Sequence, residues 1–441
     1  MSEIFSIILQ LIIFLIIFSF PFTPKILNNS FDTTSYKFKI IDAHSLNILF
    51  FLYICLILSF ININLELLFN SYLILSIIYL IFSYKDFKIS FKKENKTLFF
   101  FFIIILISIF FYIAQNLKLE WDGVNHWLEK VLIFFNGKQI EDLKNVNTHP
   151  HYPHLGSYVW ALFWKNSYLG HEYLGRFFYV YLYITSIFLI TNNLNLKNIF
   201  YKILLILFLI IITFEPYLLA GYQEYLIFST LIIAARYISF FDFKNNRNYK
   251  FIFLILIILY LNCWFKDEGL IYFFIFSSLF ILMINLSNHS KLMILSLIII
   301  LILIQYFLQK YIIGVYDFPQ DISLKNLISD IINFKILIIK LSKIIFHIFV
   351  SFVKYPLWIV IFVPIIGKIF LKQKFNYNER YFLICLFFNL AFLVGIFFTF
   401  KNFDFMLKVS LDRLLFQTSG FYLIFILISL NNLNILKNKI I

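Results

Sequence analysis

Long apolar runs separated by short polar stretches occupy almost the whole chain. A helix that crosses a bilayer needs about 20 mostly apolar residues, because the hydrocarbon core is about 30 Å thick. The pattern therefore predicts an all-α fold, a polytopic transmembrane helical bundle that forms a single domain over residues 1–441. We expect about thirteen spans, at roughly 4–22, 47–63, 66–83, 98–114, 174–192, 199–214, 218–241, 249–265, 270–286, 291–308, 344–366, 381–400 and 414–431.

The distribution of Lys and Arg between the loops predicts which side of the membrane each loop faces. Loops 84–97, 242–250 and 367–380 have an excess of Lys and Arg over Asp and Glu, and the C-terminal tail is basic. Short cytoplasmic loops are enriched in Lys and Arg, so these segments are expected inside and the N-terminus outside. The remaining polar stretches then fall on the extracytoplasmic side: 115–173, 215–224, 266–269, 309–343 and 401–413.

Two apolar stretches need separate interpretations. The run 4–22 has neither a basic start nor a small-residue cleavage site, so we interpret it as a retained helix and not as a signal peptide. Residues 156–166 (GSYVWALFWKN) are too few to cross the membrane. They predict an interfacial helix on the outer leaflet, with Tyr158, Trp160 and Trp164 at headgroup depth.

The composition excludes a soluble protein. Hydrophobic residues make up 62% of the chain and charged residues only 14%, whereas soluble domains carry about 25% charged residues. The net charge of +14 lies in loops expected on the cytoplasmic face, which disfavours a nucleic-acid partner. Cys55, Cys263 and Cys385 are scattered within apolar runs, which argues against a disulfide framework or a cysteine metal site.

Loop 115–173 holds the first candidate for chemistry. Asp122 follows a span and its short exit, and a carboxylate at the mouth of a helix bundle can act as a general base or hold a cation. A loop carboxylate that is simply solvated is the alternative. Trp121, His126, Trp127 and Lys130 lie around Asp122 at near-helical spacing, which favours a site.

Three histidines follow in the same loop. His149, His151 and His154 could bind zinc, but the HxHxxH spacing is not a strong metal pattern. Histidines that are hydrogen-bonded in an ordered loop are the favoured interpretation, and contact with a phosphate group is a third. The sequence therefore predicts no metal site here.

The later outer segments each carry a smaller set of polar residues. Glu224 lies where a span begins after Pro216 and Gly221, so it is either a residue favoured by the helix dipole or a second acid facing the same cavity. Lys266 and Glu268 separate two apolar runs and form either a simple turn or an anion site with a paired acid.

Arg413 follows Asp412 near the start of the last span. Its fork of donors matches phosphate oxygens, and an interfacial anchor or an ion pair with Asp412 is the alternative. The chain contains no GxxxxGK[ST], GxGxxG or GxSxG motif, which argues against a nucleotide-binding domain. The energised substrates available on the outer face are chiefly lipid-linked.

Several of these stretches resemble a known superfamily. WDGVNHWLEKVLIFFNG followed by HPHYPHLGSYVWAL resembles the first outer loop of bacterial C-type integral-membrane glycosyltransferases, the group that includes protein O-mannosyltransferases and the aminoarabinose transferases of lipid A. AGYQEYLIFSTL, FKDEGL and SLDRLLFQ resemble later segments of that superfamily, in the same order. The chain departs from the pattern at His151, where Asp is usual, and at His154, where a second Pro is usual. It also has three spans before the one that leads into the loop, where better-known relatives have one.

The resemblance implies transfer of a sugar from a polyprenyl-phosphate donor to a glycan, lipid or protein acceptor. The reaction would occur on the extracytoplasmic side of a bacterial inner membrane. Asp122 and Glu224 would be the catalytic acids, and a divalent cation assists some relatives, although this sequence offers no cage for one. The predicted substrate-binding set is Lys266, Glu268, Arg413, His149, His151, Tyr152, Trp121 and His126.

Two other functions remain open from the sequence. A transporter or flippase for a lipid-linked sugar would also need polar residues near the outer leaflet, although transporters usually place them at the bilayer midplane. A polysaccharide polymerase or ligase would be expected to use a large late outer loop rich in Arg, and residues 309–343 contain no Arg.

Overall fold

The computed structural model describes residues 2–31, 37–93, 96–116, 118–194, 196, 198–244, 248–315, 325, 328 and 332–432. Within these residues the regular secondary structure is helical and no strand is present, as the apolar pattern predicts. Eight of the described helices are long and apolar enough to cross a membrane. They are α3 (Ile40–Phe60), α4 (Leu65–Lys93), α5 (Lys96–Gln115), α8 (Tyr173–Thr191), α13 (Asn288–Phe307), α15 (Phe334–Lys354), α17 (Tyr377–Phe397) and α18 (Phe403–Asn432).

Five further apolar helices are shorter than a full span. They are α1 (Ser2–Ile17), α9 (Ile199–Thr213), α11 (Tyr249–Tyr260) with its continuation η4 (Leu261–Trp264), α12 (Glu268–Met283) and α16 (Pro356–Phe370). The described helices therefore fit an integral membrane protein, but the expected thirteen full-length spans are not confirmed.

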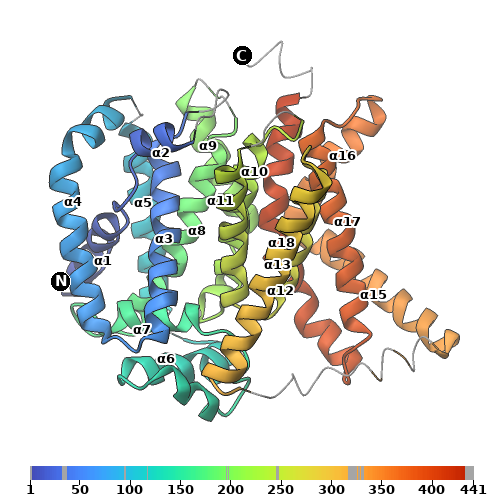
Figure 1. Ribbon diagram of the computed structural model, residues 1–441, viewed down its shortest axis with the longest axis horizontal. Helices are drawn as coiled ribbons and strands as arrows, with labels where there is room; N and C mark the ends of the chain where they lie inside the picture. Colours follow the sequence, from blue (N-terminus) through green and yellow to red (C-terminus); the bar gives the residue numbers. More distant parts are fainter. Residues whose placement is uncertain are drawn as a thin grey trace.

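The bundle has two distinct ends (Figure 1). Loop 115–173 covers one end with η1 (Gly123–Leu128), α6 (Glu129–Phe135), η2 (Ile140–Asn145) and α7 (Leu155–Lys165). We call this the loop end. The short helix α2 (Pro24–Ser30) and the C-terminal end of α18 lie at the other end, which we call the basic end because the Lys-rich segment at the end of α4 is also there.

The centre of the bundle is formed by α8, α10 (Glu224–Phe240) and α18. Every residue of α8 is buried, and α10 packs against both α8 and α18. Aromatic rings fill the contacts, as in the stacked pair Phe228–Phe416 with ring centroids 4.7 Å apart. A helix that is apolar on all sides is typical of the interior of a large bundle. Because these helices are held by close packing, the side chains at their ends have fixed positions.

The prediction of an interfacial helix at 156–166 is correct about the helix and wrong about its surroundings. Helix α7 spans Leu155–Lys165, but Tyr158 and Trp160 are 2% and 0% exposed. The helix packs against α6, α8 and α3 inside the protein, and Trp164 alone of the three aromatic residues is partly exposed. An eleven-residue helix with so many apolar side chains gains more from protein contacts on all sides than from one face in lipid.

The predicted span 344–366 is divided into two helices. Helix α15 ends at Lys354, Tyr355 is extended with φ −105° and ψ 110°, and α16 begins at Pro356. A proline disfavours the helical conformation of the residue before it, which explains the break. The predicted outer segment 309–343 lies in part outside the described residues, and its last ten residues, 334–343, belong to α15.

Candidate functional site

Four ionisable side chains from distant parts of the sequence meet at the loop end. Asp122 immediately precedes η1, and Glu224 is the first residue of α10. Lys266 lies in the link between η4 and α12, and Arg413 is on α18. The packing of α10 against α18 and η4 places these positions together, although up to 291 residues separate them along the chain.

The two cations hold both carboxylates. Arg413 contacts Asp122 Oδ2 through Nη2 at 2.6 Å and Glu224 Oε1 through Nη2 and Nε at 2.5 and 2.8 Å. Lys266 Nζ donates to the same Glu224 oxygen at 2.9 Å and lies 3.8 Å from Glu268 Oε1. Charge-assisted hydrogen bonds of this kind are short and strong, so they fix the side-chain positions. We call Asp122, Glu224, Lys266, Glu268 and Arg413 the loop-end cluster.

The loop-end cluster has a buried floor and a more accessible rim. The side chains of Glu224 and Lys266 are 0% and 3% exposed, whereas those of Asp122, Arg413 and Glu268 are 13%, 14% and 25% exposed. Glu224 Oε2 and Glu268 Oε2 are buried atoms without a hydrogen-bond partner among the described residues. Buried polar atoms normally find partners, so these two oxygens are candidates to receive a donor from a bound molecule.

A close approach of two glycines brings Asp122 and Glu224 near enough for both to contact Arg413. The Cα atoms of Gly123 and Gly221 face each other, and a Cβ added to Gly123 would lie 2.5 Å from the carbonyl oxygen of Ala220. Gly221 has φ +99°, a conformation that side-chain-bearing residues rarely adopt. Glu120 N also donates to Ala220 O at 3.0 Å, which ties the segment before Asp122 to the turn before α10.

Lys130 fixes the loop that carries the histidines. It is fully buried, and its ammonium group donates to the carbonyl oxygens of Pro150 and Tyr152 at 3.3 and 2.5 Å. It also lies over the rings of Trp127 and Tyr152 at 5.7 and 5.8 Å. Burial lowers the pKa of Lys130 to about 7. Lys130 was singled out in the sequence as a neighbour of Asp122, and its geometry indicates a role in shaping the loop.

The aromatic residues predicted to bind substrate form one wall beside Asp122. Tyr152 stacks on Trp127 and on His149, with centroids 5.4 and 5.0 Å away. The ring of His126 lies 4.2 Å from that of His149 and 4.9 Å from that of Trp121, edge to face. Trp121 is 62% exposed, so it is accessible to a molecule that approaches the loop-end cluster.

His126 and His151 are neutral at physiological pH. Burial lowers the pKa of His126 to about 4 and that of His151 to about 3. His126 Nε2 lies 3.8 Å from Asp122 Oδ1, and Nδ1 lies 3.1 Å from Thr148 Oγ1. The His126–Asp122 contact is therefore between a neutral ring and a carboxylate and is not an ion pair.

Asp267 is a site residue that the sequence did not single out. Its carboxyl oxygen lies 3.5 Å from His151 Nε2, and burial followed by repulsion from Glu268 raises its pKa to about 8. The raised pKa favours the protonated form of Asp267 near neutral pH. Its position between Lys266 and Glu268 in the FKDEGL segment was the available signal, because three adjacent ionisable residues between apolar runs are costly unless they interact.

The third histidine of the HxHxxH pattern is separate from the first two. His154 is fully buried, and its Nε2 lies 2.8 Å from Ser59 Oγ on α3. Its ring contacts Phe60 and Trp264, and burial lowers its pKa to about 3. Among the described residues no group of three His, Cys, Asp or Glu side chains is arranged to hold a metal ion. His154 has the position of an ordered, hydrogen-bonded loop residue.

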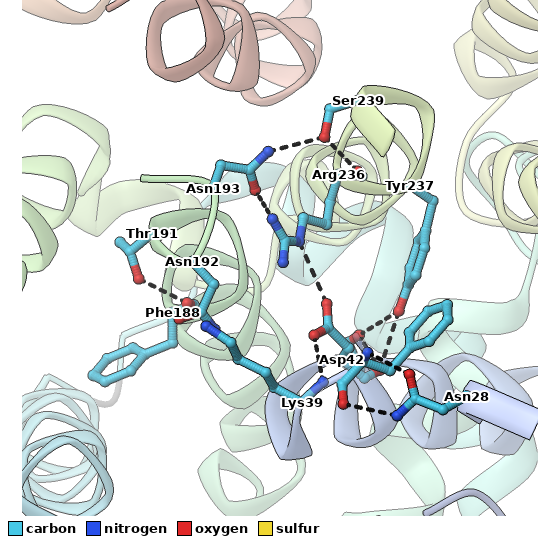
Figure 2. Close-up of polar contacts among 12 residues, drawn as sticks. Asn28, Lys39, Asp42, Phe188, Thr191, Asn192, Asn193, Arg236, Tyr237 and Ser239 are labelled. Carbon is cyan, nitrogen blue, oxygen red and sulfur yellow. Dashed lines mark hydrogen bonds and ion pairs between the residues drawn. The ribbon is translucent and has the colours of Figure 1, made fainter. Parts of the chain in front are cut away.

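Two buried ion pairs at the basic end were missed in the sequence. Arg236 on α10 contacts Asp42 on α3 at 3.4 Å, and both side chains are 0% exposed (Figure 2). Lys368 on α16 contacts Glu379 on α17, and these side chains are 2% and 0% exposed. Arg236 lies within the predicted span 218–241, and an ionisable residue in such a run is the signal that could have identified this pair. Asp42 stands in the mixed segment YKFKIIDAHSLN, which carries no such signal.

The comparisons with known proteins neither support nor oppose the resemblance. No protein-family model matches the chain, and neither a curated protein nor a solved structure matches it.

Proposed function

We propose that the chain is a glycosyltransferase that moves a sugar from a polyprenyl-phosphate donor to an acceptor on the extracytoplasmic side of a bacterial inner membrane. One observation carries the proposal: three ion pairs, Lys266–Glu224, Glu224–Arg413 and Arg413–Asp122, link these residues at the loop end, although they come from four separate segments. A base beside a pair of cations is the combination that such a transfer requires.

Asp122 would act as the general base. An acceptor hydroxyl would hydrogen-bond to Asp122 Oδ1, the oxygen that Arg413 does not contact. As the acceptor oxygen attacks the anomeric carbon, its proton passes to Asp122. The acceptor oxygen attacks from the face opposite the phosphate, so the bond between that carbon and the phosphate oxygen breaks with inversion of configuration. Neutral His126, 3.8 Å from Oδ1, can orient the carboxylate without neutralising it.

Lys266 and Arg413 would stabilise the departing lipid phosphate. The electron pair of the broken bond stays on the phosphate, which therefore leaves without needing a proton if cations hold its charge. Arg413 Nη1 has no hydrogen-bond partner among the described residues, which leaves a planar donor available for a phosphate oxygen. His149, which stacks on Tyr152 beside the loop-end cluster, is a further candidate contact for the phosphate.

Glu224 is best suited to a positioning role in this scheme. It is fully buried and receives hydrogen bonds from both cations through one oxygen. A carboxylate in this position compensates the charges of Lys266 and Arg413 before the phosphate binds. It would thereby hold the two cations in place, while Asp122 at the rim faces the substrate.

A flippase or transporter of a lipid-linked sugar is the second candidate, and one observation favours it. The Asp42–Arg236 and Lys368–Glu379 pairs are buried between apolar helices, and ionisable residues in such positions often mark transport pathways. The polysaccharide polymerase or ligase has no comparable support among the described residues.

Reconstitution of the full chain into proteoliposomes distinguishes the two functions. The vesicles receive polyprenyl-phosphate sugars labelled in the sugar, together with a membrane extract as the source of acceptor. A transferase releases unglycosylated polyprenyl phosphate as label leaves the polyprenyl carrier for the acceptor. Movement of label between leaflets while the sugar stays lipid-linked would instead support the transporter and overturn the transferase.

A further inference from the structure

A second site lies at the basic end, away from the loop-end cluster. A cavity of about 470 Å³ opens between α1, α3, α4, α5, α8 and α9. Its volume is within the range of about 300–1,000 Å³ that is usual for small-molecule sites. Most of its wall is apolar, with aromatic side chains that include Phe22, Phe87 and Phe188. A wall of this kind suits a hydrocarbon chain.

Two lysines give the cavity a positive charge. Lys39 precedes α3 and Lys202 lies on α9, and both are lining residues. Lys202 Nζ donates to Asn192 Oδ1 at the end of α8. Figure 2 shows the Lys39 side chain extending toward Asn192 as well. The described residues that line the cavity include no Asp or Glu, so the cavity combines apolar walls with two converging cations.

Asp42 is the acidic residue nearest to Lys39 in the sequence, and its carboxylate oxygens do not contact the Lys39 ammonium group in the interactions described below. Its Oδ1 accepts from Arg236 Nε at 3.4 Å, and its Oδ2 accepts from the backbone N–H of Lys39 at 2.9 Å (Figure 2). Arg236 therefore compensates the charge of Asp42. The ammonium group of Lys39 points away from that pair and toward Asn192.

Further lysines outside the cavity add positive charge to the basic end. Lys85 and Lys88 lie exposed near the end of α4, at the basic end of the bundle. Basic pockets between membrane helices attract anionic lipid headgroups, because each nearby Lys or Arg adds attraction that is modest alone and cumulative in a group. Charge complementarity and the apolar wall thus point to one occupant, a lipid with a net negative headgroup.

We infer that this cavity binds one anionic phospholipid. Its phosphate contacts Lys39, Lys202 and the amide of Asn192, and an acyl chain enters the apolar space between α1, α5 and α9. The inference is independent of the proposed function, because none of these residues belongs to the loop-end cluster.

The test is the retention of phosphatidylglycerol by the purified full chain. The chain is equilibrated in mixed micelles with phosphatidylglycerol or phosphatidylcholine, and bound lipid is counted by native mass spectrometry. We expect one phosphatidylglycerol to be retained in preference to phosphatidylcholine. Lys39→Gln combined with Lys202→Gln should weaken its binding roughly 30-fold, whereas Lys39→Arg with Lys202→Arg should keep it.

Lys85→Gln with Lys88→Gln is the matched control, because it removes the same charge from the same end of the bundle outside the cavity lining. This control should weaken lipid retention far less than the cavity variant, because neither lysine lines the cavity. Equal retention of the two lipids by the unmodified chain would overturn the inference. Equal loss of binding in the control and in the cavity variant would also overturn the inference. The lipid would then be attracted by the total charge of the basic end and not by the cavity.

Discussion

The two ends of the bundle both bury a carboxylate against an arginine, but they use the oxygens differently. At the basic end, Asp42 Oδ1 accepts from Arg236 and Oδ2 accepts from Lys39 N. At the loop end, Glu224 Oε1 accepts from Arg413 and Lys266, while Oε2 has no hydrogen-bond partner among the described residues. The first arrangement is saturated and joins helices, whereas the second retains capacity for a bound molecule.

The ionisable side chains of the two ends also differ in their solvent exposure. Asp42, Arg236 and Glu379 are 0% exposed, and Glu379 also uses both oxygens, one toward Lys368 and Ser429 and the other toward Asn376 N. The loop-end cluster reaches the surface through Asp122 and Arg413. Buried ionisable groups are therefore not by themselves a sign of chemistry in this chain. Unused acceptors beside an accessible rim are the more informative feature.

The largest expected effect is on activity at the loop end. Asp122→Asn should reduce sugar transfer about 10²–10⁴-fold, because a positioned general base contributes about that factor. Stability should change little, since the amide keeps a hydrogen-bond acceptor for Arg413. The assay is release of labelled sugar from a polyprenyl-phosphate donor. Asp404→Asn is the control, because Asp404 is 67% exposed and paired only with Lys343 among the described residues. Full activity of the Asp122 variant would remove this residue from the mechanism.

The second effect is on stability at the basic end. Arg236→Met leaves Asp42 buried without its cation and should lower the free energy of unfolding by about 3–5 kcal/mol. Unfolding in mixed micelles measures this loss. The double variant Asp42→Asn, Arg236→Met should recover most of it, because no uncompensated charge remains. If the folded single variant transfers sugar normally, the two ends of the bundle have distinct roles. A specific loss of transfer in the folded variant would show that the basic end also contributes to activity.

Arg413→Lys tests the geometry of the loop-end cation. Lysine keeps the charge but loses the planar fork that reaches both carboxylates, so transfer should fall on the order of 100-fold. Arg380→Lys, at an exposed position on α17, should leave transfer unchanged. Unchanged transfer by the Arg413 variant would show that charge alone is sufficient at this position.

A further expected effect concerns the pH dependence of stability. Burial raises the pKa of Asp267 to about 8, whereas an unfolded aspartate titrates near pH 3.9. Between about pH 4 and pH 8 the folded chain therefore holds a proton that the unfolded chain has lost, and this contribution to stability falls as pH rises. Asp267→Asn should make the decline between pH 5 and pH 8 shallower in unfolding titrations. An identical slope in both proteins would contradict the assigned protonation.

Local sequence information predicted the helical class and the polar segments of the loop end. Apolar length alone predicts spans, and the charged stretches around Asp122, Lys266 and Arg413 were visible as interruptions of that pattern. The pairing between them was not visible, because it depends on how α10 packs against α18 and η4. The sequence could place these residues at one end but could not show that Arg413 is shared by two carboxylates.

Other predictions from the sequence were wrong because they depend on how the helices pack, which a single sequence does not show. Pro356 ends one helix and starts another, whereas Pro364 lies inside α16 without breaking it. Membrane helices tolerate prolines when neighbouring groups satisfy the freed carbonyl, which is a property of the surroundings. The burial of Trp160 in α7 likewise depends on α6 and α8, which enclose it.

The central claim is that the loop-end cluster performs sugar transfer from the extracytoplasmic side. Val124, 46% exposed and two residues after Asp122, is suited to test it as Val124→Cys, because Cys55, Cys263 and Cys385 are buried and should not react. Sealed right-side-out membrane vesicles are treated with a membrane-impermeant maleimide, and sugar transfer is measured before and after. We predict labelling without permeabilisation and loss of transfer in this variant only. Labelling that requires permeabilised vesicles would place Asp122 on the cytoplasmic side and contradict the claim.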